Sequence, residues 1–338
     1  MRRIGLIPRK RLQNIPPELR AKHEYCFFLH DQCLRALKEY EHNKAHHVSV
    51  EFSSKLTAAQ FENLAAEDPI EALQATGYPN EAKRVILNHI TMAMISDFLH
   101  HVFEAFKCLE KRKIIVALNL LRKPLKDNLL YLSWMLADEN DFYNDFTLGD
   151  PEKLTPKKVG KQRVDIFAKA AAKTDISHLI DASVLNFLLY DKKNPDGFEI
   201  LFQHAVHLVT VERLELRTSP ENFNFIFKDP SDADIYLSIY NWMPYIMLCL
   251  THVIMGLFDK IHPMDEGARV ATLVRTVVGF GLVEKYESSF ALEIVADALP
   301  EHIGCNFCQF KLRLRACLKR VLRSAWLHDS PRQLQLMG

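Results

Sequence analysis

The cysteines and histidines near the C-terminal end form the densest group of potential metal ligands in the sequence. His302, Cys305, Cys308 and Cys317 lie in the segment HIGCNFCQFKLRLRAC. A turn at the glycine before the Cys-x-x-Cys pair would let both thiolates point to one side, as in half of a zinc site. No second Cys-x-x-Cys pair occurs, and Cys317 falls within an expected helix. Zinc, a redox dithiol and plain buried thiols are the alternatives, and the sequence indicates no other cofactor.

A histidine pair in the segment FQHAVHLVTVE is the second candidate site. His204 and His207 are three positions apart, so their imidazoles would share one face of a helix. Such a pair could hold a metal ion for a hydrolase, although no third ligand stands at a recognisable spacing. His207 could instead be a general base, since an imidazole pKa of about 6.5 suits neutral pH. Hydrogen-bonded histidines beside the core are the structural alternative.

Two clusters of basic residues are candidates for binding nucleic acid. The first alternates with apolar residues near the C-terminus and consists of Lys311, Arg313, Arg315, Lys319, Arg320 and Arg323. The second is N-terminal and consists of Arg2, Arg3, Arg9, Lys10 and Arg11. Both could contact phosphates through salt-dependent ion pairs. A solvated helix face and a disordered tail explain them equally well.

The segment RKPLKDN, residues 122–128, interrupts an otherwise apolar helical pattern. Pro124 removes a backbone donor and crowds the carbonyl four residues earlier, so we expect a kink rather than a break. Arg122 and Lys126 are four positions apart and could bind a phosphate in a groove between helices. Alternatively, Arg122 donates to carbonyls that the kink leaves free.

The elements that must position these residues are helices. Apolar residues keep helical spacing almost unbroken over residues 84–136, which predicts long packed helices. The same pattern predicts helices at 24–40, 57–64, 81–109, 114–137, 164–173, 176–190, 198–206, 235–258, 265–283, 288–298 and 306–327. The fold class is therefore all-α, a multi-helix bundle, with one small β-hairpin possible near residues 207–227.

Changes in composition suggest four parts. Residues 1–22 form a basic N-terminal arm, and residues 23–80 form an N-terminal helical segment. Residues 81–300 form the main helical bundle, with a surface loop at 138–161. Residues 301–338 form a basic C-terminal helix that carries the Cys-x-x-Cys pair.

Composition limits the classes of function. The 338 residues are 48% hydrophobic and 25% charged, which is typical of a globular protein. Only 11 glycines argue against a nucleotide-binding fold built on glycine-rich loops, and the formal charge of +1 gives no overall bias toward nucleic acid or membrane. Seven scattered cysteines suit the reducing cytoplasm. Residues 235–258 lack charges, but Asn241, Pro244 and His252 favour a buried core helix over a membrane span.

The long helices, together with the segments LNLLRKPLKDNLLYLSWMLAD and LFQHAVHLVT…NFNFIF, resemble uncharacterised bacterial helical proteins. Those proteins stand near the HEPN-like abortive-infection group (higher-eukaryote-and-prokaryote nucleotide-binding). The resemblance covers residues 84–258. It implies a prokaryotic defence or toxin setting with RNA as the target, and it places Arg122, His204 and His207 at an interhelical groove.

That superfamily cleaves RNA without metal, using an arginine followed by a histidine after four to six residues. Arg84 and His89 fit this spacing, as do two other pairs in the chain. In this role Arg84 would stabilise the phosphate charge and His89 would handle the proton of the attacking 2′-hydroxyl.

Three functional hypotheses follow. The first is a HEPN-like, RNA-associated protein that could act as a metal-independent endoribonuclease. The second is a non-enzymatic interaction module that binds a protein partner or forms a homodimer. The third is a metal-dependent hydrolase built on His204 and His207.

Overall fold

The computed structural model describes residues 3–147, 150, 152–207, 209 and 233–284. Helices account for all regular secondary structure in these ranges, which confirms the all-α multi-helix prediction. The helices are α1 (Arg20–His42), α2 (Lys55–Ala65), α3 (Pro69–Ala75), α4 (Pro79–Glu110), α5 (Ile114–Lys123), a π-helical turn (Pro124–Asn128), α6 (Leu129–Ala137), α7 (Glu139–Thr147), α8 (Pro156–Val159), α9 (Arg163–Ala171), a 3₁₀ turn (Ser177–Leu179), α10 (Ala182–Tyr190), α11 (Phe198–Val206), α12 (Ala233–Ile261) and α13 (Glu266–Glu284).

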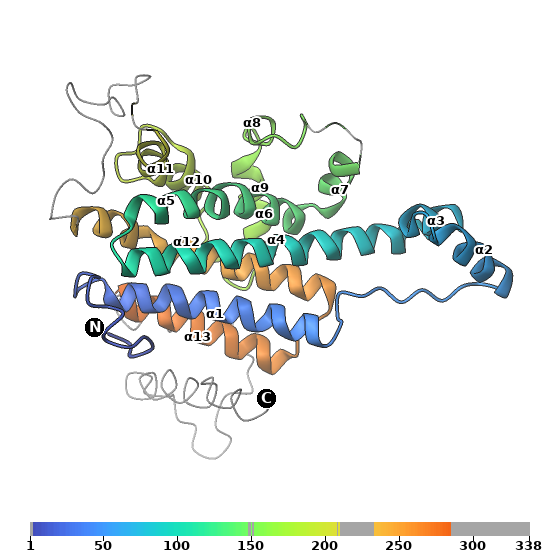
Figure 1. The fold of residues 1–338 in the computed structure, drawn as a ribbon, viewed down its shortest axis with the longest axis horizontal. Coiled ribbons are helices and arrows are strands. Elements are labelled where there is room, and N and C mark those ends of the chain that lie inside the picture. Colours follow the sequence, from blue (N-terminus) through green and yellow to red (C-terminus); the bar gives the residue numbers. More distant parts are fainter. Residues whose placement is uncertain (1–2, 148–149, 151, 208, 210–232, 285–338) are drawn as a thin grey trace, which may run out of the picture.

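The uncharged helix α12 lies at the centre of the bundle. It packs lengthwise against α1 and also contacts α6 and α13 (Figure 1). In the described part of the chain it is the one helix long and apolar enough to span a membrane, but most of its apolar stretch is buried by other helices. The prediction of a buried core helix over residues 235–258 is therefore confirmed.

Helices α1 and α13 approach each other closely at Gly279. An ideal Cβ at this position would lie 2.7 Å from Cε2 of Tyr25. The Tyr25 ring cannot easily move aside, because it is fully buried and its hydroxyl donates to the carbonyl of Thr276 at 2.7 Å. A glycine is thus needed here for packing rather than for an unusual backbone conformation.

Pro124 changes the local helix type without ending the helix. The helical backbone runs from α5 through the π-helical turn into α6, so the expected kink takes the form of one wider turn. The turn is tied to α4, because Asn128 Nδ2 and Lys123 Nζ both donate to the carboxylate of Asp97, at 2.9 Å each. π-Helical turns of this kind are frequent at functional sites.

Helices α2 and α3 form a projecting arm at the N-terminal end of α4 (Figure 1). The rings of Phe52, Phe61 and Tyr78 give the arm its own small aromatic core, with centroids 5.1 and 5.2 Å apart. Ser54 caps α2 by accepting from the Thr57 amide. The helix begins at Lys55, so the predicted start at Thr57 is two residues late.

Two expectations about chain organisation are wrong. The residues predicted as a basic N-terminal arm do not extend away from the bundle, because Ile7, Leu12, Ile15 and Leu19 are buried. The expected loop at 138–161 contains the helices α7 and α8. The suggested hairpin at 207–227 lies almost entirely outside the described residues, as do the helices expected at 288–298 and 306–327.

Candidate nucleic-acid interface

The predicted C-terminal sites lie outside the described residues. This applies to the zinc-site candidates His302, Cys305, Cys308 and Cys317, and to the basic cluster between Lys311 and Arg323. Within the described ranges, no group of three or more His, Cys, Asp or Glu side chains could hold a metal ion.

Arg84 is engaged by a carboxylate on α7. Its Nη1 and Nη2 donate to Oε1 and Oε2 of Glu139 at 2.9 and 2.6 Å, which is a bidentate ion pair. Burial acts to raise the pKa of Glu139, but the hydrogen bond from Arg84 and the nearby positive charges outweigh it and lower the pKa. His89 is exposed, five positions further along α4. The Arg84 guanidinium is therefore already neutralised by its own chain.

His204 and His207 were predicted to share one face of a helix, but they do not. Helix α11 ends at Val206, and His207 follows it with an extended backbone. His204 is half-buried, whereas His207 is exposed. The helical spacing that favoured a metal pair is therefore lost at the second histidine.

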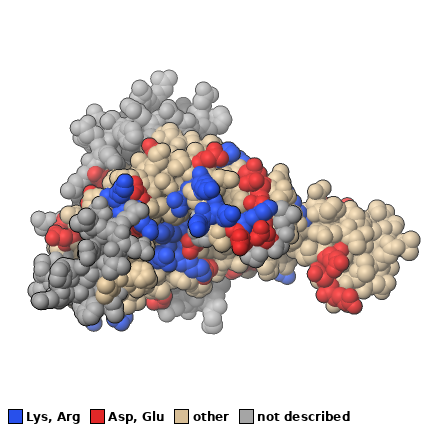
Figure 2. All heavy atoms as spheres, turned by 90° about the horizontal axis from the view of Figure 1, so that it is seen from above, with Lys and Arg blue, Asp and Glu red and all other residues tan. Residues whose placement is uncertain are grey.

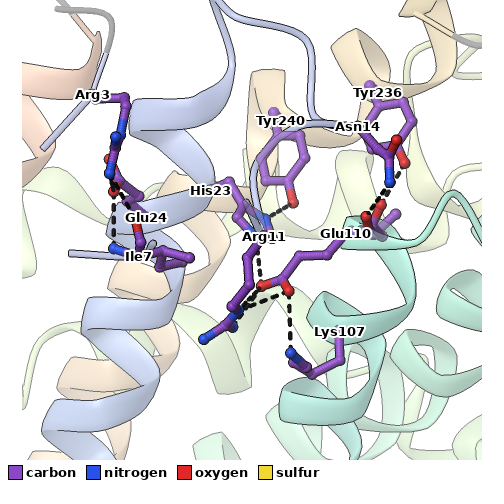
Figure 3. A network of polar contacts seen from close by, with 11 residues as sticks. Arg3, Ile7, Arg11, Asn14, His23, Glu24, Lys107, Glu110, Tyr236 and Tyr240 are labelled. Carbon is purple, nitrogen blue, oxygen red and sulfur yellow. Dashed lines mark hydrogen bonds and ion pairs between the residues drawn. The ribbon is translucent and has the colours of Figure 1, made fainter. Parts of the chain in front are cut away.

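A buried polar network lies at the opposite end of α4 (Figure 3). One part of it centres on Glu24 of α1, whose carboxylate is fully buried. It accepts from the backbone amides of residues 4–7, at distances of 2.6 to 3.2 Å. Glu24 thus fixes the first residues of the described chain to the bundle.

The other part of this network centres on Glu110, at the C-terminal end of α4. Arg11 donates to both of its carboxylate oxygens at 2.6 to 3.1 Å. Burial acts to raise the pKa of Glu110, but hydrogen bonds from His23 and Arg11 outweigh it and lower the pKa to about 2. Burial lowers the pKa of His23, so its neutral ring donates through Nε2 to Glu110 and accepts at Nδ1 from the Tyr240 hydroxyl.

This network is closed rather than open to a ligand. His23 and Tyr240 are fully buried, and both carboxylates are satisfied by groups of the same chain. Its role is therefore structural, as a clamp on residues 3–15. The clamp also removes Arg11 from the N-terminal basic cluster that was predicted to contact phosphates.

Arg122 and Lys126, which were predicted to bind a phosphate together at the π-helical turn, lie in different surroundings. Lys126 is largely buried and pairs with Glu199 of α11, which also accepts from Gln203 Nε2 at 3.0 Å. Arg122 remains exposed. Burial raises the pKa of the neighbouring Asp127, and the charges of Arg122 and Lys126 counteract this only in part.

Tyr190 connects this turn to α9. The Lys126 ammonium lies 5.3 Å from the Tyr190 ring centroid, and the Arg163 guanidinium carbon lies 4.0 Å from it. Both are cation–π contacts. The Tyr190 hydroxyl donates to the carbonyl of Lys126 at 2.5 Å, and Arg163 Nε donates to Asn186 at 3.2 Å. Residues from α9, α10 and the π-helical turn therefore form one unit.

Next to this unit lies a surface that we call the basic face, formed by Lys157, Lys158, Lys161 and Arg163. Residues 153–163 contain five Lys or Arg side chains and no Asp or Glu. The three lysines of the basic face are exposed, and Figure 2 shows Lys and Arg gathered on this side of the molecule. Two exposed apolar residues follow residues of this region in the sequence. Val164, 41% exposed, directly follows Arg163, and Phe187, 49% exposed, directly follows Asn186, to which Arg163 donates.

The basic face was not predicted as a site. Its residues fall within the expected loop at 138–161, where the basic run in PKKVGKQR was the available signal. The proximity of Phe187 depends on how α9 and α10 pack, which no local pattern reveals. Comparison with protein families, curated proteins and solved structures finds no match for the chain.

Proposed function

We propose that this protein binds single-stranded RNA on the basic face, without cleaving it. The observation that supports this is the group of exposed lysines on the basic face, together with the exposed Phe187, which directly follows Asn186, the residue to which Arg163 donates. Lysine and arginine side chains contact the phosphate backbone, and an exposed aromatic ring offers a surface on which a base can stack. Arg122, exposed at the nearby π-helical turn, could extend this surface.

Binding is favoured over cleavage by the state of the predicted catalytic pair. The Arg84 guanidinium is held by both oxygens of Glu139, so stabilising a phosphate would first require that ion pair to break. The HEPN-like resemblance and its defence setting remain a prediction. The proposal keeps RNA as the target and assigns the contact to different residues.

Salt-dependent binding of a labelled single-stranded RNA, measured by fluorescence anisotropy, tests the proposal. A triple variant, Lys157→Ala, Lys158→Ala and Lys161→Ala, should bind at least tenfold more weakly. If each lysine contacts one phosphate, the slope of log K against log salt should become less steep by about 2, since each contact contributes about 0.7 on single strands.

The matched control removes three exposed lysines elsewhere: Lys38→Ala, Lys111→Ala and Lys113→Ala. This control should bind like the parent protein. Phe187→Ala should weaken binding by about 1–3 kcal/mol while leaving the salt dependence unchanged, because stacking is not ionic. Equal binding by the parent and the basic-face variant would refute the proposal.

A further inference from the structure

The projecting arm carries an apolar strip that the described part of the chain leaves uncovered. None of the residues of α2 is buried. Leu56 is 71% exposed and Leu64 is 48% exposed. They are eight positions apart, so both lie on the same side of the helix. Side chains this exposed gain nothing from the fold of a single copy, which points to a binding role.

The arm is also strongly acidic. Residues 51–82 contain six carboxylates and one lysine, a formal charge of −5; the carboxylates are Glu51, Glu62, Glu67, Asp68, Glu71 and Glu81. Figure 2 shows acidic side chains along one edge of the arm and a patch of basic side chains in the middle of the molecule. A surface that fits the arm must therefore combine apolar side chains with positive charge.

The basic face has this combination. Residues 153–163 carry a formal charge of +5, of which Lys153 is paired with Asp145. The exposed Val164 directly follows them, and the exposed Phe187 directly follows Asn186, to which Arg163 donates. Each surface thus presents two exposed apolar residues and a net charge, which is negative on the arm and positive on the basic face, although Lys55 lies beside Leu56 and Asp165 beside Val164. Such complementarity favours association and fixes its orientation.

The arm cannot reach the basic face of its own chain. Helix α4 continues without interruption from Pro79 to Glu110, and α3 packs against it. Figure 1 shows α2 and α3 beyond the end of the bundle, directed away from α8 and α9. We propose that the arm of one copy docks on the basic face of a second copy.

This contact is head-to-tail, so a pair of copies keeps one free arm, on one copy, and one free face, on the other. Association can therefore continue beyond a dimer. The contact occupies the basic face, which is also the proposed RNA-binding surface, so self-association and RNA binding are mutually exclusive. The inference rests on the arm and on charge complementarity, and it does not require that RNA binds.

Analytical ultracentrifugation of the full chain at low salt, without RNA, tests the inference. The parent should show an average mass of at least two 39.1-kDa copies, falling toward one copy at high salt. An arm variant, Leu56→Lys with Leu64→Lys, should be monomeric, and so should a face variant, Lys158→Glu with Lys161→Glu. Folding should survive, because all four side chains are exposed.

Mixing the two variants provides the sharpest test. The arm variant keeps an intact face and the face variant keeps an intact arm, so the mixture should form a one-to-one complex that stops at two copies. A control, Val116→Lys with Leu237→Lys, alters apolar residues of similar exposure on α5 and α12 and should associate like the parent. A monomeric parent, or an arm variant that associates like the parent, would overturn the inference.

The outcome is independent of the test for RNA. If the inference holds, the monomeric arm variant should bind RNA at least as tightly as the parent, because nothing competes for its face. RNA binding by a monomeric parent would refute self-association and leave the proposed function standing. Self-association of a parent that does not bind RNA would do the reverse.

Discussion

Replacing the carboxylate of Glu110 by an amide should destabilise the fold through the clamp on the N-terminal residues. Glu110→Gln keeps the size of the side chain and removes its charge. The folded-state pKa of about 2, against an ordinary value of 4.5, corresponds to about 3 kcal/mol at neutral pH. Breaking a buried ion pair by removing one partner costs a similar 3–5 kcal/mol. We therefore expect a loss of about 3 kcal/mol.

Urea unfolding followed by circular dichroism measures this loss. The pKa of Glu110 is lower in the folded state, so its stabilisation is present above pH 4.5 and decreases as the pH falls toward 2. The difference between parent and variant should therefore shrink over that range. Glu104→Gln, at an exposed carboxylate on the same helix, is the control and should change stability by less than 0.5 kcal/mol.

Two further observations connect the effect to the clamp. Trypsin should cleave Glu110→Gln faster than the parent after Arg9, Lys10 or Arg11, because residues 3–15 are less firmly held. Arg11→Gln combined with Glu110→Gln should cost less than the sum of the single changes, because both remove the same ion pair. A loss below 1 kcal/mol at pH 7, or a difference that does not change down to pH 3, would refute the reasoning.

Three further predictions concern other sites. Burial lowers the pKa of His252 to about 4, so between pH 6.5 and 4 the unfolded state binds a proton that the folded state does not. As the pH falls through this window, the parent should lose up to about 3 kcal/mol of unfolding free energy relative to His252→Gln. Urea unfolding at each pH measures this loss. Gly279→Ala should cost about 1–3 kcal/mol in the same assay, since its Cβ would collide with Tyr25, and a neutral result would contradict the packing. Arg84→Ala should lower the free energy of unfolding by no more than about 1 kcal/mol. A labelled RNA should stay as intact with this variant as with the parent. RNA cleavage by the parent that disappears in the variant would restore the nuclease hypothesis.

The helices could be predicted from the sequence because each follows from a local pattern. The periodic apolar residues of α4, α11 and α12 fix their extents to within a few positions. The effect of Pro124 was also predictable, since a proline inside a strongly apolar helix must be accommodated. Short helices such as α7 and α8 were missed because polar, proline-containing segments resemble loops.

The polar network could not be predicted in the same way. Glu24 and Glu110 occur in charged stretches that look solvent-exposed, and their burial depends on a partner far away in the sequence. Arg11 and Glu110 are 99 positions apart. The position of the basic N-terminal residues could not be predicted for the same reason. Their charges suggested an arm, but their apolar neighbours anchor them to the bundle. Local patterns describe one residue's surroundings along the chain and carry no information about such pairings.

The net charge of +1 conceals the feature on which both proposals depend. The arm contributes −5 and residues 153–163 contribute +5, so the two cancel in the sum over the sequence. They do not cancel in space, because the acidic edge of the arm lies well away from the basic patch in Figure 2. Screening at physiological salt limits electrostatic interactions between exposed charges to about 8 Å. A polyanion or a second copy therefore meets a net positive charge at the basic face and a net negative charge at the arm. The two charged segments can be identified as separate binding surfaces only from the folded structure, in which the helices hold them apart.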